Sequence, residues 1–224
     1  MNAFDIDYTL GIFPILLKYI DITLSMTLIS TIIALVIAIT IAIIKTFKIK
    51  VFSQIADVYI SFFRGTPLVV QLFILYYGLP QIFPALSSVD AYTASIVGLS
   101  LHFSAYMAEA IRGAISSIDK GQFEAANSLG MSQTQTFIYV ILPQAIRVAI
   151  PSLMNNFIDL LKSTSIVFVL GVPEIMAVAQ QEAASSYKYF ESYLAVAIVY
   201  WVLVVSFGYI QRKLEKRLNK AYTI

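Results

Sequence analysis

The chain has 224 residues, of which 59% are hydrophobic and 12% are charged, and its mean hydropathy is +0.81. This composition excludes an ordinary soluble domain and is typical of a membrane protein. The net charge is +2 and the basic residues form no aromatic-lined patch, so no nucleic acid is expected as a partner. The absence of cysteine excludes disulfides, thiolate metal sites and cysteine nucleophiles.

The first residues form a separate amphipathic stretch, in which Phe4, Leu10 and neighbouring apolar side chains are interleaved with acids. Asp5 and Asp7 precede any lysine or arginine, which is the reverse of the charge order in a secretory signal. We therefore expect residues 1–18 to be a retained extracytoplasmic segment that lies at the membrane interface.

Five apolar intervals approach the roughly 20 residues that a helix needs to cross a bilayer. They cover residues 20–45, 55–79, 91–115, 145–170 and 192–211. The chain has no tandem repeat and no low-complexity linker that would divide it into domains. The sequence therefore predicts an all-α integral membrane protein with five transmembrane helices, in one transmembrane domain over residues 19–213.

The basic residues between these intervals and near their ends are distributed very unequally between the two sides of the membrane. Lys18 and Lys188 fall on one side, and all the others fall on the opposite side: Lys45, Lys48, Lys50, Arg112, Lys120, Arg147, Arg212, Lys213, Lys216, Arg217 and Lys220. Because cytoplasmic loops carry the excess of lysine and arginine, we expect the N-terminus outside, the C-terminus in the cytoplasm, and a basic cytoplasmic tail over residues 214–224.

The connection between the third and fourth intervals, residues 117–143, is the longest polar-leaning segment of the chain. Phe123, Ala126 and Leu129 recur at helical spacing, and Gly130 follows as a helix stop in left-handed geometry. The charge distribution places this connection in the cytoplasm.

A second short helix can begin directly after that glycine, since Ser132 and Gln135 have the spacing of a capping box. Two amphipathic helices meeting at an angle would form a docking surface outside the membrane. The alternative is an ordinary connecting loop, and periodicity alone does not choose between them.

Residues 124–143 carry a long pattern at fixed spacing, EAANSLGMSQTQTFIYVILP. The pattern resembles the EAA loop of ABC importer permeases, with Val140 where that loop usually has isoleucine. The resemblance implies the type I ABC importer permease fold and a coupling helix that inserts into a cleft of an ATPase subunit. Glu124 would be its charged anchor, and Gly130 would set the angle between the two helices. The residues so implied in ATPase coupling are Glu124, Ala125, Ala126, Leu129, Gly130 and Pro143.

Asp159 and Lys162 interrupt the fourth apolar interval. A central charged residue costs about 2.5–3.5 kcal/mol on insertion, whereas each leucine returns only about 0.3–0.6 kcal/mol. This interval should therefore face other helices or a wet cavity rather than lipid. A simpler alternative is a self-satisfied pair, because positions i and i+3 are neighbours on a helix.

The second apolar interval contains Arg64, Gly65, Thr66 and Pro67 in succession. Proline removes a backbone donor and disfavours helix at the residue before it, so a kink or break is expected. A broken membrane helix is tolerated where it lines a cavity, and Arg64 could then bind a carboxylate. In the alternative, Arg64 reaches toward the cytoplasmic headgroups from a simple kink.

Three stretches resemble the polar amino acid branch of the importer family, the histidine, glutamine, arginine and cystine type. They read FRGTPLVVQLFILYYGLP, AEAIRGAISSIDKGQFEAANSLG and NNFIDLLKSTSIVFVLGVPEI. Ser163 stands where branch members often have an acid, while Asp159 adds one a turn earlier. With this branch in view, the candidates for the substrate path are Arg64, Thr66, Asn155, Asn156, Asp159, Ser163 and Thr164. A zwitterionic substrate needs an anion and a cation facing it, and Asp159 and Arg64 could supply them.

The resemblance implies a permease subunit of an ATP-driven importer that moves a polar amino acid or a derivative into the cell. Its implied partners are a pair of ABC ATPases, a second permease copy, alike or related, and an extracytoplasmic substrate-binding protein, at a bacterial cell membrane. The chain itself has no P-loop, HExxH or GxSxG motif, so catalysis is not expected. No cofactor or metal is expected in this chain; ATP and magnesium would be bound by the partner ATPase.

Two other classes stay open at this stage. An ion-gradient-driven secondary transporter or channel also uses broken helices and midplane charges. A membrane scaffold would show no uptake at all. His102, the one histidine of the chain, is interpreted as a buried, hydrogen-bonded residue rather than as a substrate contact.

Overall fold

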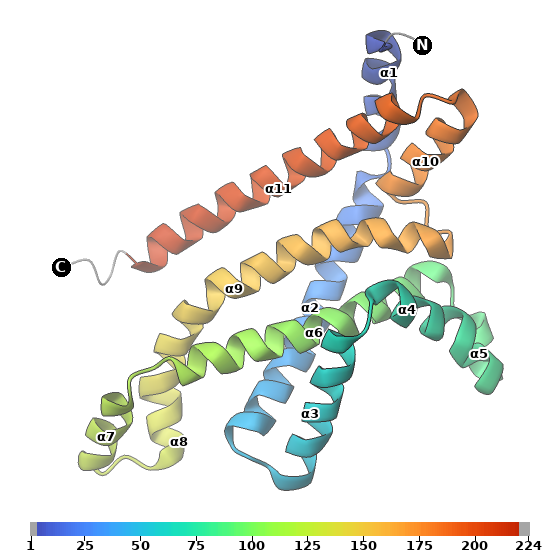
Figure 1. Ribbon diagram of the computed structural model, residues 1–224. Helices are drawn as coiled ribbons and strands as arrows, with labels where there is room; N and C mark the ends of the chain where they lie inside the picture. The colour runs from blue at the N-terminus through green and yellow to red at the C-terminus, as the bar shows by residue number, and fades with distance from the viewer. Residues whose placement is uncertain (1–3, 220–224) are drawn as a thin grey trace.

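The computed structural model describes residues 4–219, and every regular element in that range is a helix (Figure 1). In chain order these elements are α1 Ile6–Leu17, α2 Ile20–Thr46, α3 Lys50–Gly65, α4 Leu68–Phe73, the π-helix η1 Ile74–Gly78, α5 Leu79–Ile82, the 3-10 helix η2 Pro84–Ser88, α6 Ala91–Ser116, α7 Lys120–Ser128, α8 Gln133–Gln135, the π-helix η3 Thr136–Ile141, α9 Leu142–Ser163, the 3-10 helix η4 Thr164–Leu170, α10 Ile175–Ser186 and α11 Tyr189–Asn219.

Within residues 4–219, four helices are long and apolar enough to cross a membrane: α2, α6, the run from Gln133 to Leu170, and α11. A fifth span exists only if α3 and the segment Leu68–Ile82 are taken together, and these two are bent by 110° at the residues between them. The kink or break expected after Arg64 is thus a sharp break.

The helix bounds agree closely with the expected intervals for α2 and α6, and less closely elsewhere. The helix of the second interval begins earlier than predicted, at Lys50, because the first turns of α3 are amphipathic. The fourth continues upstream through η3 and α8 without a gap, and it ends as 3-10 helix from Thr164. Of the tail expected over 214–224, α11 covers the part up to Asn219, and residues 220–224 lie outside the described range.

The main core lies where α2 crosses α6, with α3, α4, α9 and η4 around the crossing (Figure 1). Ala34 and Ala38 of α2 are fully buried there. Gly98 of α6 permits close approach of α4, because a Cβ at this position would lie 2.6 Å from Leu72 Cδ2. Small residues at such contacts let membrane helices pack closely where no hydrophobic force drives association.

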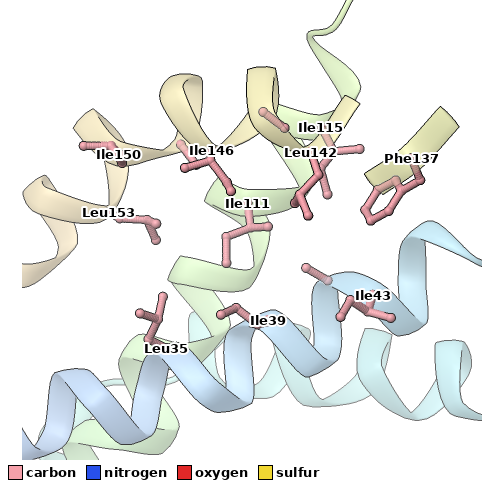
Figure 2. A pocket seen from close by; sticks show the side chains of 13 residues that line it. Leu35, Ile39, Ile43, Ile111, Ile115, Phe137, Leu142, Ile146, Ile150 and Leu153 are labelled. Atoms are coloured by element: carbon pink, nitrogen blue, oxygen red, sulfur yellow. The ribbon is translucent and has the colours of Figure 1, made fainter. Parts of the chain in front are cut away.

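An apolar groove remains between α2, α6 and the first half of α9 (Figure 2). Its volume is about 400 Å³. Aliphatic side chains of α2 and of α9 point toward one another across it, with Ile111 of α6 between them.

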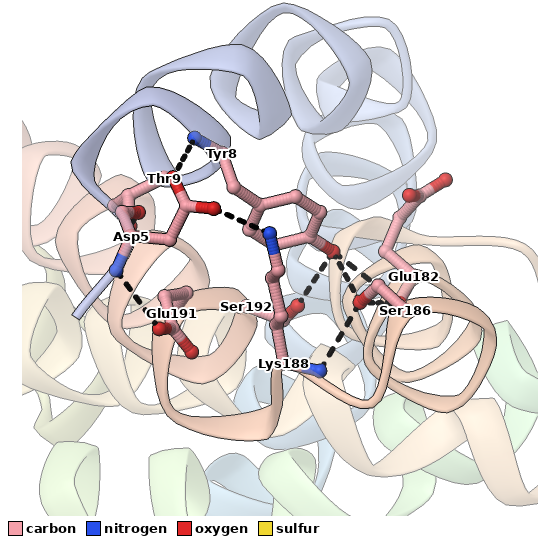
Figure 3. Close-up of polar contacts among 8 residues, drawn as sticks. All are labelled: Asp5, Tyr8, Thr9, Glu182, Ser186, Lys188, Glu191 and Ser192. Carbon is pink, nitrogen blue, oxygen red and sulfur yellow. Dashed lines mark hydrogen bonds and ion pairs between the residues drawn. The ribbon is translucent and has the colours of Figure 1, made fainter. Parts of the chain in front are cut away.

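The N-terminal segment is a helix that packs onto α10 and α11. Asp5 caps it by accepting from Tyr8 N at 2.9 Å, and it also forms an ion pair with Lys188 (Figure 3). The Tyr8 hydroxyl lies 2.8 Å from Ser186 Oγ and 3.1 Å from Ser192 Oγ. These contacts join the beginning of the chain to the turn between α10 and α11.

Candidate functional site

The break after α3 is stabilised by one buried side chain, Gln71. Gly65 ends α3, and Thr66 and Pro67 then adopt extended backbone before α4. Gln71 Nε2 donates to Phe63 O at 3.0 Å, to Thr66 O at 3.1 Å and to Thr66 Oγ1 at 2.8 Å. Carbonyls freed by the break thereby regain a donor, as a non-helical backbone at membrane depth requires.

The other end of Gln71 contacts α6, where Gln71 Oε1 accepts from His102 Nδ1 at 2.9 Å. His102 is partly buried, and its hydrogen bond goes to protein, in agreement with the interpretation made from the sequence. Sequence reasoning did not single out Gln71. The sequence signal for its role is that Gln71 is the one amide side chain in an otherwise apolar run, five residues after Thr66.

Arg64 does not reach Asp159 in the part of the chain that the structure describes. Its Nη1 lies 3.8 Å from Glu109 Oε2, and its guanidinium lies 5.4 Å from the centre of the Tyr106 ring. The expected cation facing a substrate is thus already near an intramolecular carboxylate. That Arg64 and Asp159 face a zwitterionic substrate together stays a prediction.

Glu109 is the hub of this charged cluster. Arg112 donates to it through Nε at 2.9 Å and through Nη2 at 2.7 Å, and Lys45 Nζ lies 3.8 Å from its Oε1. Lys45 also forms an ion pair with Asp57 of α3. The cluster therefore ties together α2, α3 and α6. The signal in the sequence was an acid and a base three residues apart near the end of an apolar interval.

Asp159 and Lys162 form the self-satisfied pair, with Oδ1 and Nζ 2.7 Å apart. Both side chains are more than half exposed, so the pair lies on an open face of α9. Asn155, one turn earlier, is also exposed, and its Oδ1 accepts from Gln211 Nε2 of α11 at 3.2 Å.

The remaining candidates of the substrate path are less accessible. Asn156 Nδ2 donates to Ser152 O at 2.8 Å within α9. Thr164 is fully buried, and its hydroxyl donates to Leu161 O at 2.7 Å where the helix changes to 3-10 geometry. Ser163 is half-buried at the last turn of α9. Because η4 packs against α4, this transition and the break at Thr66 are close in space.

The connection over residues 117–143 contains the two predicted helices. Asp119 caps α7 by accepting from Gly121 N, and Gly130 has a φ of +77° directly after α7. Ser132 and Gln135 form the capping box in both directions. The second helix then continues as the π-helix η3 into α9, so Pro143 lies at the first turn of a long helix and not at the end of a loop.

The exposed face of α7 carries the residues that the sequence pattern emphasised. Ala126 is only 3% exposed and anchors α7 against its neighbours, whereas Glu124 and Ala125 are open to the surroundings. Leu129 is 82% exposed, a large apolar side chain without a cover. This surface lies next to the start of α9, because α7 packs against η3 and η3 continues into α9.

Glu174 is a buried carboxylate that sequence reasoning missed. It caps α10 by accepting from Ala177 N at 2.9 Å, and it accepts from Tyr200 Oη of α11 at 2.7 Å. Burial raises the pKa of Glu174. Because Glu174 lies between η4 and α10, its two hydrogen bonds connect the start of α10 to α11.

A family model described as "Binding-protein-dependent transport system inner membrane component" matches residues 34–220. The chain belongs to this family of ABC transporter permeases. The all-helical architecture and the break, cluster and connection described above are thus features of a permease subunit.

Relatives that span its whole length agree with this assignment. The permease is 56% identical over 220 residues to "Probable amino-acid ABC transporter permease protein PatM" of Vibrio harveyi, covering 98% of this chain and 99% of that one. It is 48% identical over 222 residues to "Probable amino-acid permease protein YxeN" of Bacillus subtilis (strain 168), covering 99% of both.

A solved structure has the same fold. A chain of "Crystal structure of an amino acid ABC transporter with histidines" superposes with a TM-score of 0.90 at 36% identity, covering 96% of the permease and 100% of that chain. A chain of the MetNI methionine ABC transporter, in an inward-facing conformation, superposes with a TM-score of 0.74 at 19% identity and shows the fold alone.

Proposed function

We propose that this permease is the transmembrane subunit of an ATP-driven importer that moves a polar amino acid or a derivative into the cell. The observation that carries the proposal is the nearly full-length similarity to permeases whose names specify amino acids, among them the arginine permease ArtQ. The glutamine permease GlnP is similar over 78% of this chain. ATP and magnesium would be bound by a separate pair of ATPase subunits. The permease would lie in a bacterial cell membrane beside a second copy, alike or related, and would receive substrate from an extracytoplasmic binding protein.

The proposed topology has five spans, with the N-terminus outside and the C-terminus in the cytoplasm. The unequal distribution of lysine and arginine supports this orientation. The second span would consist of α3 and the segment Leu68–Ile82, broken at Thr66 and Pro67. In this topology α1 lies on the extracytoplasmic side, and α7 and α8 lie in the cytoplasm.

The α7 surface would dock onto the ATPase. Leu129 would insert into an apolar part of the ATPase cleft, Glu124 would be the charged anchor, and Ala125 would allow close approach. Ala126 and Pro143 act from inside, since Ala126 fixes α7 and Pro143 begins the helix that receives the motion. Closure of the ATPase pair would then rock α9 as a rigid body.

The substrate path would follow the open polar face of α9. Asn155 and Asp159 are exposed there, and the partner Lys162 keeps the Asp159 carboxylate neutralised until a substrate ammonium group competes for it. Asn156, Ser163 and Thr164 would shape the backbone beside that face, and Thr66 would do so at the break. Arg64 would contact substrate only after leaving Glu109.

The coupling role is tested at Gly130, whose positive φ disfavours any side chain with a Cβ by about 1–2 kcal/mol. Gly130→Val should abolish the ATP hydrolysis that binding protein and substrate stimulate in proteoliposomes, while membrane insertion stays normal. Gly130→Asn should keep part of it, since asparagine tolerates left-handed backbone. Gly113→Val, at a helical glycine with open space around it, is the control. Full stimulation in Gly130→Val would refute the coupling role.

The energy source separates the importer from a secondary transporter or channel. Uptake into proteoliposomes loaded with ATP should continue when ionophores dissipate all ion gradients, and it should stop without ATP. Uptake that follows an ion gradient and ignores ATP would favour the other class.

A further inference from the structure

The apolar groove between α2, α6 and α9 has no occupant within the described chain. Its lining is made of aliphatic side chains and one phenyl ring: Leu35, Ile39, Ala42, Ile43, Ile111, Ile115, Phe137, Leu142, Ala145, Ile146, Ala149, Ile150 and Leu153. Nothing in this lining can hydrogen-bond through a side chain, so a polar ligand would lose its hydration there without replacement. The occupant must be hydrocarbon.

The groove is too short to hold a transmembrane helix along its length. A helix that crosses a bilayer is about 30 Å long, whereas the groove follows α2 for about 12 Å. The groove has a volume of about 400 Å³ in total, and it extends along α2 from Leu35 to Ile43. A thin, flexible chain can follow this length, whereas a helix can insert only single side chains.

Two lysines, Lys48 and Lys50, follow the end of α2 that borders the groove. Figure 2 shows Ile43 and Phe137 at the same end, and Phe137 packs edge-on against Phe47 with ring centres 5.2 Å apart. Lys48 follows Phe47 directly, and Lys50 begins α3. Both side chains are exposed, and neither forms an ion pair or hydrogen bond with another described residue.

We propose that the groove binds one acyl chain of an anionic phospholipid, whose phosphate is held by Lys48 and Lys50. The hydrocarbon lining fits the chain, and the two lysines after α2 complement the charge of the headgroup, as basic residues beside an anionic membrane surface do. The leaflet follows from the proposed orientation, which places this end at the cytoplasmic side.

The lipid would act as a removable filler between α9 and the α2–α6 pair. Ile39 is 44% exposed and Ile146 is 50% exposed, and these two side chains lie on opposite sides of the groove. A bound chain would contact both and support the first half of α9, the part that begins next to the coupling connection.

The test uses the permease–ATPase complex in nanodiscs of phosphatidylcholine doped with a trace of a photoactivatable phospholipid, carrying the reactive group on its acyl chain. With a phosphatidylglycerol probe, cross-links should concentrate on groove residues of α2 and α9. Ile39→Trp, which fills the groove, should reduce this labelling at least several-fold. Val36→Trp, at an exposed position of α2 outside the lining, should leave it unchanged.

The headgroup is tested separately, so that failure of the importer function and failure of the lipid site are distinguishable. Lys48→Gln with Lys50→Gln should lower labelling by the phosphatidylglycerol probe to the level of a phosphatidylcholine probe, while Lys213→Gln should not. Equal labelling by both probes in the wild type would overturn the anionic site. Labelling spread evenly over α2, or cross-links from the groove to a second permease chain, would overturn the acyl-chain site.

Discussion

At the scale of single residues, Glu109 has the largest number of charged neighbours in the described chain. It faces Lys45, Arg64 and Arg112, while its own side chain is only one-fifth exposed. Three cations around one carboxylate are stable only as long as that carboxylate is ionised. The acid therefore holds α2, α3 and α6 at fixed distances near one end of the proposed membrane region.

Replacing this acid should loosen the three helices together. In Glu109→Gln the cations repel one another, and we expect a loss of about 1–3 kcal/mol of stability, because a partly buried charge partner is removed. The measurement is thermal unfolding of the purified complex in detergent. Glu182→Gln, at an acid without a described cation partner, is the control, and an equal melting temperature in both variants would contradict the hub role.

The contact of Asp5 with Lys188 should depend on pH. The Lys188 ammonium, followed by the Tyr8 amide, lowers the pKa of Asp5, and the same contact raises the pKa of Lys188. A lowered pKa stabilises the folded chain above the ordinary aspartate pKa of about 3.9, and this stabilisation is lost as the pH falls through the lowered value.

We therefore expect the melting temperature of Asp5→Asn to lie below that of the wild type at neutral pH, with the gap closing under acid conditions below the ordinary aspartate pKa. A melting series from neutral to acid pH checks this. Asp7→Asn, at an acid that has no described ion pair, should show no such trend. A gap that stays constant down to the lowest pH would exclude the ion pair as its source.

Residue patterns predicted the local contacts better than the long-range ones. The capping box at Ser132, the left-handed Gly130 and the Asp159–Lys162 alternative all depend on neighbours within four positions, and the structure contains all three. Arg64 and Asp159, ninety-five positions apart, are predicted to face one substrate, and the carboxylate that the structure places near Arg64 is Glu109 on another helix. Sequence spacing cannot rank such distant partners.

At the scale of elements, the break between α3 and α4 depends on Gln71 as much as on Pro67. Proline explains why the helix ends, but the bend of 110° also leaves carbonyls that only the Gln71 amide satisfies. Gln71→Leu should therefore cost about 1–3 kcal/mol, the penalty for unsatisfied buried groups. Gln81→Leu, at an exposed glutamine of α5, is the matched control in thermal unfolding. Equal stability of both variants would show that water replaces the amide.

The apolar intervals predicted α2 and α6 closely because both helices are largely apolar and are bounded by polar segments. The π-helices η1 and η3 and the 3-10 helix η4 were not predicted. These helices differ from an α-helix in the spacing of the backbone hydrogen bond, which joins residues three or five positions apart instead of four. Tertiary packing determines which spacing forms. Hydropathy carries no information about it.

At the scale of the whole molecule, the proposed orientation is directly accessible to experiment, since the chain contains no cysteine. Ser128→Cys on α7 and Ser185→Cys on α10 introduce single thiols at exposed positions. In intact cells a membrane-impermeant maleimide should label the second and not the first, and lysis should expose both. The opposite pattern would invert the topology, and equal labelling of both would place them on one side.

The length of α11 limits how the whole chain can move. Its 31 residues form one rod of about 46 Å at 1.5 Å per residue, and the hydrocarbon layer is only about 30 Å thick. The surplus of about 16 Å carries Arg212, Lys213, Lys216 and Arg217 on the same unbroken helix (Figure 1). Tyr189 and Tyr193 lie at the other end of α11. Sliding of the helix along the membrane normal would therefore pull either the tyrosines or the cations into hydrocarbon. Tilting moves neither set far, so the depth of the subunit stays fixed while its inclination is free to change.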